Sequence, residues 1–181
     1  MTYRKLSRAM MVVALGAAAM MVFPTTATAQ PRVHQEGYVV ECSGAGDGYT
    51  AFVTLYENSQ FGDEATLRIE TADTTLLGGR SDGPFLTDGT IDEIVVALTD
   101  DATQLFAGLA TVSGSYTVSG KPTRVHDVTN EGEVIVIDVG TRTPLAVDLT
   151  LEYAGTTIAL DCGPAFAYDV NSLERRFGTP G

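Results

Sequence analysis

Carboxylates are the most abundant reactive side chains in this sequence, with 23 Asp and Glu residues against 11 Lys and Arg. Two carboxyl groups that face one groove can hydrolyse a glycosidic bond, one protonated as the acid and the other ionised. Asp92 with Glu93, and Asp100 with Asp101, are adjacent pairs. Neighbouring strand residues point to opposite faces, so such pairs can serve one substrate only from a loop. The chain also lacks Trp for a sugar platform. An extracellular hydrolase that uses a carboxylate pair is therefore only the alternative to a non-enzymatic protein. We assign no catalytic residue.

Oxygen-rich loops can instead hold calcium, which takes six to eight oxygen ligands in a flexible cage. Four carboxylates fall within one stretch of twelve residues, and they are Asp82, Asp88, Asp92 and Glu93. Their spacing differs from that of the EF-hand loop, and a solvated acidic loop is the interpretation we prefer. We expect no cofactor. A calcium-binding extracellular domain is the alternative, with these four residues as candidate metal ligands.

The histidines and cysteines offer little catalytic chemistry. His34 and His126 are far apart in the sequence, and no G-x-S-x-G motif presents a serine to a base, which disfavours a nucleophilic triad. Cys42 and Cys162 have no C-x-x-C spacing, which disfavours redox catalysis. An even cysteine count in an exported chain indicates a structural disulfide, here one that ties the first strand to the last. Two buried free thiols are the alternative.

The first 29 residues are typical of a cleavable signal peptide. Arg4, Lys5 and Arg8 form a positive region, the run Met10–Phe23 is apolar, and Ala27–Ala29 is a small-residue cleavage site. An uncleaved membrane anchor is the alternative, but the apolar run is shorter than the roughly 20 residues of a spanning helix. We therefore expect secretion to the extracellular space.

The expected mature chain is strongly acidic. Removal of the signal peptide leaves 152 of the 181 residues, with 8 basic and 23 acidic side chains and a net charge of −15. This length is typical of one domain. Such a surface repels nucleic acid and anionic lipid, because both need neutralising Lys and Arg. We expect a non-enzymatic extracellular protein with a binding or structural role, a monomer whose partner is an extracellular protein or a cell-surface component. We expect no bound nucleic acid and no membrane anchor after cleavage.

One stretch predicts a β-hairpin that delivers a cysteine to the core. Residues 144–163, PLAVDLTLEYAGTTIALDCG, alternate between apolar and polar side chains, which is the pattern of a half-buried strand. A turn at Ala154–Gly155 would place Asp148 opposite Asp161, and like charges facing each other are destabilising. We therefore predict the turn at Gly155–Thr156, where glycine can supply the positive φ of a type II′ turn.

The remaining pattern predicts an all-β single domain. Roughly eight or nine short strands, with turn signals about every 8 to 12 residues, favour an antiparallel β-sandwich of immunoglobulin-like or Greek-key type. A closed β-barrel is the alternative. We expect residues 30–37 to be a mobile N-terminal arm, 38–169 the β-sandwich domain and 170–181 a C-terminal tail. Residues 133–139, EVIVIDV, are apolar on both faces and predict a central strand covered from both sides.

Three segments resemble small exported actinobacterial proteins of unknown function. The segments are Tyr38…Cys42-x-Gly44, Leu55-Tyr56-Glu57-Asn58-Ser59, and Leu149-x-Leu151-x-Tyr153-Ala154-Gly155-Thr156-Thr157 with Cys162 and Ala165-Phe166. The resemblance spans most of the mature chain. It implies a bridged, secreted β domain, and it implies no activity and no functional residue. Residues 53–58 with Phe61-Gly62 also resemble the opening of a βγ-crystallin Greek-key motif, but its paired Asp/Asn calcium signature is missing, so calcium binding is not transferred.

Overall fold

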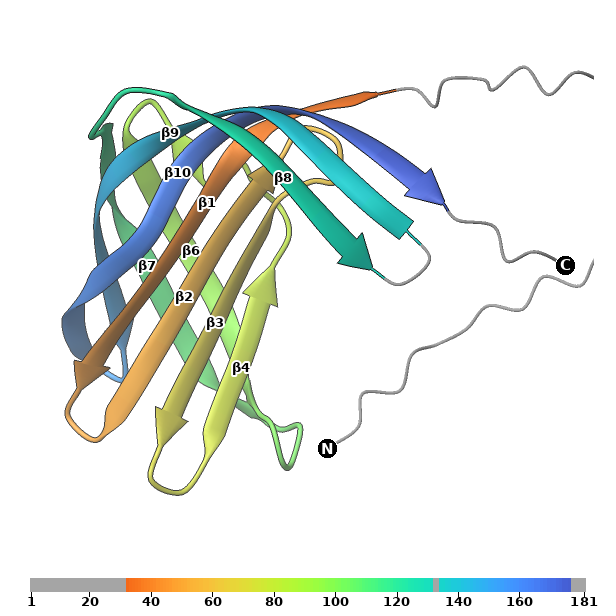
Figure 1. The fold of residues 1–181 in the computed structure, drawn as a ribbon. Helices are drawn as coiled ribbons and strands as arrows, with labels where there is room; N and C mark the ends of the chain where they lie inside the picture. The colour runs from red at the N-terminus through yellow and green to blue at the C-terminus, as the bar shows by residue number, and fades with distance from the viewer. Residues whose placement is uncertain (1–31, 132–133, 177–181) are drawn as a thin grey trace, which may run out of the picture.

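The protein folds into antiparallel β-strands (Figure 1). The structure is a computed structural model that describes residues 32–131 and 134–176, so the predicted signal peptide lies outside the described residues. The strands are β1 (Val33–Gly46), β2 (Tyr49–Asn58), β3 (Glu64–Thr71), β4 (Thr75–Arg80), β5 (Leu86–Thr87), β6 (Thr90–Asp100), β7 (Phe106–Val118), β8 (Thr123–Glu131), β9 (Val134–Tyr153) and β10 (Thr156–Arg176). The prediction of an all-β single domain is confirmed.

The strands form one sheet that closes into a ring. Its order is β10-β1-β2-β3-β4-β6-β7-β9-β8, with β5 paired to β6, and a further pairing between β9 and β10 completes the ring. Opposite walls of this ring face each other across the core (Figure 1). A continuous sheet therefore supplies both of the facing layers.

Alternate residues of the ring strands build the core. Ala51, Val53 and Leu55 of β2 are at most 2% exposed, and so are Leu149 and Leu151 of β9. The residues between them face outward, because successive side chains of a strand point to opposite sides. The predicted period of two is confirmed in the hairpin and in β2.

The two longest strands, β9 and β10, pair along most of their length. Residues 145–153 of β9 also pair with β7, whereas residues 134–142 pair with β8. The strand therefore takes part in the ring with one half and passes beyond it with the other. We call the part made of β8, residues 134–144 of β9 and residues 166–176 of β10 the sheet extension (Figure 1). Residues 33–39 of β1 pair with its β10 strand on the side away from β9.

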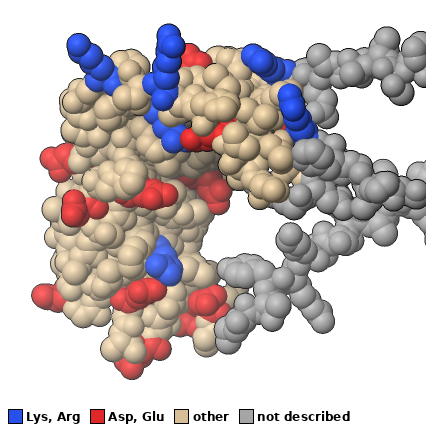
Figure 2. Space-filling view, in the orientation of Figure 1, with Lys and Arg blue, Asp and Glu red and all other residues tan. Residues whose placement is uncertain are grey.

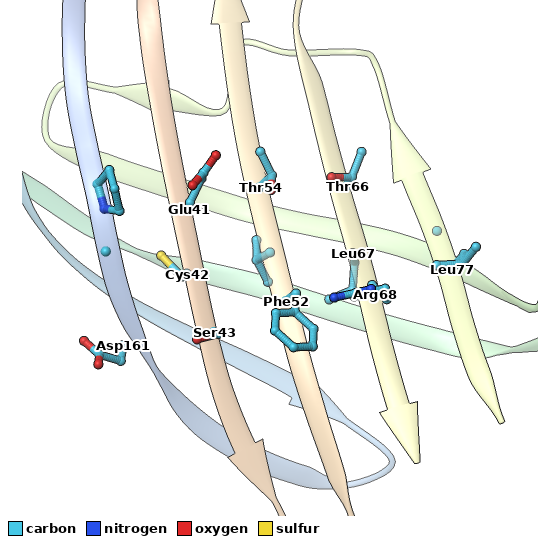
Figure 3. Close-up of a pocket in the computed structure, with 14 residues that line it drawn as sticks. Glu41, Cys42, Ser43, Phe52, Thr54, Thr66, Leu67, Arg68, Leu77 and Asp161 are labelled. Atoms are coloured by element: carbon cyan, nitrogen blue, oxygen red, sulfur yellow. The ribbon is translucent and has the colours of Figure 1, made fainter. Parts of the chain in front are cut away.

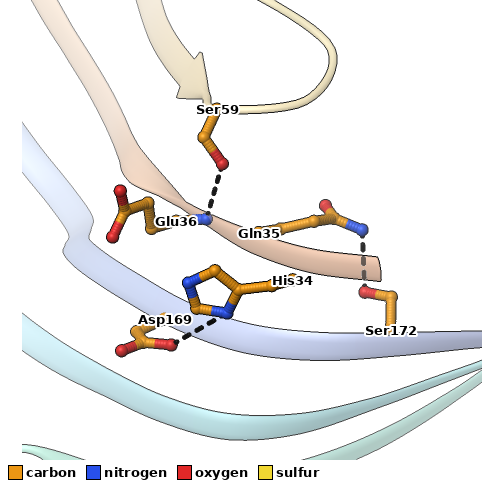
Figure 4. Close-up of polar contacts among 6 residues, drawn as sticks. All are labelled: His34, Gln35, Glu36, Ser59, Asp169 and Ser172. Atoms are coloured by element: carbon orange, nitrogen blue, oxygen red, sulfur yellow. Dashed lines mark hydrogen bonds and ion pairs between the residues drawn. The ribbon is translucent and has the colours of Figure 1, made fainter. Parts of the chain in front are cut away.

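A chain of side-chain hydrogen bonds attaches the sheet extension to the ring. Ser172 of β10 donates to the carboxylate of Asp138 on β9. Its hydroxyl oxygen accepts from the side-chain amide of Gln35 on β1 at 2.8 Å, a contact that Figure 4 shows. The amide of Asn58 on β2 donates in turn to the Gln35 side-chain oxygen at 2.9 Å. Ser172 and Asn58 are both buried. Buried polar groups that are satisfied in this way fix the position of the strands that carry them.

The turn of the β9–β10 hairpin differs from the prediction. Ala154 and Gly155 are the two loop residues, with φ of 52° and 78°, which are the two positive values of a type I′ turn. The predicted turn at Gly155–Thr156 is therefore wrong. The charge argument failed because pairing of β10 with β9 is interrupted after Leu160, and Asp161 lies opposite Ser43 of β1 instead of Asp148.

The predicted disulfide is confirmed. Cys42 and Cys162 lie directly opposite each other on β1 and β10 and are bonded. Cys42 is 6% exposed and belongs to the same buried cluster as Val40, as its phase in the strand predicted. The bond ties the first strand to the last.

The edges of the domain extend beyond the predicted boundaries. Residues 33–37, predicted to be a mobile arm, are the start of β1 and pair with β10, and residues 170–176, predicted to be a tail, continue β10. The central strand predicted for residues 133–139 is also corrected. Residues 134–138 are only half-buried and Val139 is 45% exposed, because this part of β9 lies in the sheet extension rather than against the core.

Replacing Ala154 with Asn should raise the free energy of unfolding by about 0.5 to 1 kcal/mol, because Asn adopts a positive φ more readily than Ala. Urea unfolding of the mature chain measures the difference. Thr156→Asn is the matched control, and it should not stabilise. Stabilisation by Asn at position 156 but not at 154 would instead support a turn at Gly155–Thr156.

Replacing Cys42 and Cys162 together with Ala should lower the free energy of unfolding by roughly 3 to 5 kcal/mol, because the bond closes a loop of 120 residues in the unfolded chain. The same urea titration measures this loss, and wild-type protein treated with a reductant should show a similar one. A loss of less than about 1 kcal/mol would contradict the claim that this disulfide stabilises the fold.

Candidate functional site

An open groove of about 720 Å³ lies on the outer face of the ring, across β10, β1, β2, β3 and β4 (Figure 3). Two cross-strand rows of outward-facing side chains line it. The first row is Asp161, Ser43, Phe52, Arg68 and Leu77, and the second is Glu41, Thr54 and Thr66. This volume is in the range of small-molecule and peptide sites.

Arg68 is held in a fixed position in the groove. Its guanidinium lies 4.3 Å from the centre of the Phe52 ring and 3.2 Å from the carboxylate of Glu70. Figure 3 shows Phe52 and Arg68 side by side on β2 and β3. The cation covers one face of the aromatic ring. This face of Phe52 is therefore not open to a ligand as a stacking platform.

Two carboxylates occupy the other side of the groove. Glu41 on β1 and Asp161 on β10 are exposed, and neither has an ion-pair or hydrogen-bond partner among the residues that the structure describes. Hydroxyl groups of Ser43 and Thr54 lie beside them. The described lining contains no histidine. The groove thus offers negative charge and hydroxyl groups, an arrangement suited to holding a cationic or hydrogen-bond-donating ligand.

Glu57 of β2 is a buried carboxylate and is 6% exposed. Its Oε1 atom accepts hydrogen bonds from the backbone amides of Phe85 and Leu86, the latter at 2.6 Å. Burial raises the pKa of Glu57, against the two amide hydrogen bonds, which lower it, and with a smaller upward contribution from Asp63. The carboxylate holds the start of β5 against the ring, so its position is explained by structure rather than by catalysis.

A second open pocket, of about 690 Å³, lies beside Glu57. Tyr168 of β10 borders it and donates its hydroxyl hydrogen to the Glu57 backbone carbonyl at 2.8 Å. Burial, and then the hydrogen bond with Tyr56, raise the pKa of Tyr168. At the rim, His34 Nδ1 lies 3.6 Å from Asp169 and the Ser59 hydroxyl accepts from the Glu36 amide (Figure 4). These contacts join β1, β10 and the β2–β3 loop, and they place no base beside a nucleophile.

The candidate calcium ligands do not form a cage. Asp82 is paired with Arg80, whose Nη2 donates to Oδ2 at 2.9 Å, and this partner lowers the pKa of Asp82. Asp88 occupies the turn between β5 and β6 with φ of 49°. Within residues 32–131 and 134–176, no three His, Cys, Asp or Glu side chains are grouped as a metal site requires. The calcium hypothesis therefore receives no support.

The two adjacent carboxylate pairs, Asp92–Glu93 and Asp100–Asp101, are not arranged as a catalytic dyad. Asp92 and Glu93 lie at an irregularity of β6 where both are exposed to solvent, so they do not alternate between faces. Asp100 accepts hydrogen bonds from the Thr74 hydroxyl and from the Thr103 amide, the latter at 2.7 Å, and its pKa is lowered, chiefly by Thr74. It fixes the turn that follows β6.

Sequence reasoning did not identify the groove residues. Glu41, Phe52, Arg68 and Asp161 are outward-facing strand residues far apart in the chain, and only the register of four strands brings them together. Glu57 did leave a signal, since it is in phase with the buried Ala51, Val53 and Leu55, an unusual place for a carboxylate.

No protein-family model, no curated protein and no solved structure matches the chain. None of the described segments is a helix long and apolar enough to cross a membrane. His126, the remaining histidine, is exposed on β8 opposite Val139. The described geometry therefore defines an all-β domain with a disulfide and an outer groove.

Replacing Glu57 with Ala should lower the free energy of unfolding by about 2 to 4 kcal/mol, because two buried amides lose their acceptor. Glu57→Gln keeps an acceptor oxygen and removes the charge. Because the pKa of Glu57 is raised in the folded state, the wild type loses stability as the pH rises and this carboxyl group must ionise. The stability of Glu57→Gln relative to the wild type should therefore increase between about pH 4 and pH 7.

Thermal unfolding over this pH range measures the difference, with the exposed Glu93→Gln as the control that should show no such trend. The opposite trend, in which Glu57→Gln becomes less stable relative to the wild type as the pH rises, would show that the amides favour the ionised carboxylate. That result would contradict the raised pKa.

Proposed function

We propose that this protein is an exported, extracellular binding protein without catalytic activity, and that the outer groove is its binding surface. The observation that carries the proposal is the pair of exposed carboxylates, Glu41 and Asp161, that face a concave surface without a partner among the described residues. The Cys42–Cys162 disulfide supports export, because such bonds persist in oxidising compartments. The resemblance to small exported actinobacterial proteins agrees with the same destination.

The ligand that fits is an extended, cation-bearing segment of an extracellular protein or cell-surface component. Such a segment can follow the cross-strand row from Asp161 to Leu77 and place one amine or guanidinium against Glu41 and another against Asp161. The net charge of −15 for the mature chain attracts cationic ligands over a longer range. The exposed Leu77, which is 38% exposed, gives the segment an apolar contact at the far end.

A hydrolase is not favoured by a specific observation. Asp92 and Glu93 face solvent on β6, and Asp100 is committed to the turn after that strand. Glu57 is the carboxylate whose pKa is raised, but its Oε1 atom is occupied by two backbone amides. Asp100 and Glu57 therefore serve the fold.

The proposal is tested with short immobilised peptides of basic, acidic and neutral composition, probed with the mature protein. Basic peptides should bind, and Glu41→Gln combined with Asp161→Asn should weaken their binding at least about tenfold, because both charge-assisted contacts are lost. Asp92→Asn combined with Glu93→Gln changes the net charge equally and lies outside the groove, so it is the matched control.

Equal weakening by the two double variants would show that only net charge matters, and the groove would not be the site. A broad hydrolase screen of the same proteins covers the alternative. Activity in the wild type that is lost in Asp92→Asn or Glu93→Gln, with the fold intact, would overturn the assignment as a non-enzymatic binding protein.

A further inference from the structure

The outer edge of β8 has no partner strand within the described residues. β8 pairs with β9 on one side and ends the order of the sheet. The sheet extension that carries it reaches away from the ring (Figure 1). Exposed edges are templates for pairing with another chain, and proteins that avoid this protect them with prolines, bulges or inward charges. The register of β8 with β9 is continuous and contains no bulge.

The backbone groups of β8 alternate between the two edges. The Ser119 amide donates to the Pro144 carbonyl, so the even-numbered residues of β9 direct their backbone groups toward β7 and β8. Their partners in β8 are the odd-numbered residues. The even-numbered residues of β8, which include His126, Val128 and Asn130, therefore direct their amide and carbonyl groups outward.

An apolar row crosses the sheet extension and ends at this edge. Val128 of β8, Ile137 of β9 and Leu173 of β10 lie opposite one another on the same face. Val128 is 58% exposed and Val139, on the same face of β9, is 45% exposed. A strand that continues this row beside Val128 would remove apolar surface from water.

The sequence of β8 is compatible with pairing to itself. If two copies meet antiparallel with a two-fold axis at Val128, each Val128 faces the other, His126 faces Asn130, and Asp127 faces Thr129. None of these pairs is a like-charge pair, and the polar ones can form hydrogen bonds. The apolar row then runs unbroken through both copies, from Leu173 of one to Leu173 of the other.

Neighbouring registers are less favourable. An axis at Asp127 places the two Asp127 carboxylates against each other, and an axis at Thr129 brings Val128 opposite Asn130, which interrupts the apolar row. An axis at His126 brings Val128 opposite Arg124 and breaks the apolar row. Like charges directly opposite each other destabilise a strand pair. The charged and apolar residues of β8 thus select the register centred on Val128.

The sheet extension also separates this edge from the most acidic part of the molecule. In Figure 2, Lys and Arg gather over the upper part of the molecule, where β8, β9 and β10 pass beyond the ring, and Asp and Glu predominate over the ring below. Lys121 precedes β8 and Arg124 is its second residue, and Asp127 is neutralised by Arg142 at 2.6 Å. Two copies that meet through β8 keep their acidic rings apart.

We propose that the outer edge of β8 pairs with β8 of a second copy of this chain, in the antiparallel register centred on Val128, to form a symmetric dimer. This replaces the expectation of a monomer. An edge of nine residues is about 30 Å long, so the interface belongs to the small, transient class. The dimer forms at high protein concentration and dissociates on dilution.

Sedimentation velocity of the mature chain, from about 1 µM to about 1 mM, tests the proposal, because small interfaces dissociate in this range. Val128→Pro removes an outward amide that the monomer does not use, and it should weaken the dimer at least about tenfold. Val128→Thr keeps the amide and the branched side chain and should leave dimerisation nearly unchanged. If Val128→Pro does not fold, Val128→Lys replaces it, since two lysines then meet at the axis.

The register is tested with single cysteines, which are the only free thiols because both native cysteines are bonded. Val128→Cys should form an intermolecular disulfide under mild oxidation at least about ten times faster than Asn130→Cys, which lies several residues from its own copy across the axis. A chain that stays monomeric throughout, a dimer that persists in Val128→Pro, or equal cross-linking at the two positions would each overturn the proposal.

Discussion

The long pairing of β9 with β10 is the interaction on which the other elements depend. β10 remains beside β9 while the other neighbour of β9 changes from β8 to β7, so one hairpin both closes the ring and builds the sheet extension. Gly140 permits this, because a Cβ at that position would collide with the Asp169 carbonyl of β10. The Cys42–Cys162 bond then fixes β1 to the same hairpin. Core, groove and free edge follow from this arrangement.

The acidic residues of the chain have different roles because they lie on different faces of one sheet. Glu57 points into the ring, where burial raises its pKa and backbone amides hold it. Glu41 and Asp161 point outward, line the groove and are exposed to solvent. Asp127 lies on the sheet extension beside Arg142. The net charge of the chain therefore does not show which carboxylates are buried, which are exposed and which are paired with a cation.

The sequence was sufficient to predict the elements that a short residue pattern defines. Alternation predicted the hairpin strands and the inward direction of Cys42 and Cys162, because a period of two is readable within a few residues. It was not sufficient where the outcome depends on which strands become neighbours. The apolar residues 134–139 looked like a central strand but extend past the core, and the turn was misplaced because Asp161 pairs with β1. The groove combines residues from five strands, and no local pattern contains their register.

Amide hydrogen exchange by NMR, at a protein concentration low enough to keep the chain monomeric, tests most directly whether β8, β9 and β10 form one continuous sheet beyond the ring. Slow exchange is expected for the amides of residues 134–143 of β9, together with alternation along β8, where Val125, Asp127 and Thr129 are protected and Val128 is not. Uniformly fast exchange across β8 and residues 134–144, beside a protected ring, would contradict a sheet extension that continues the β9–β10 hairpin.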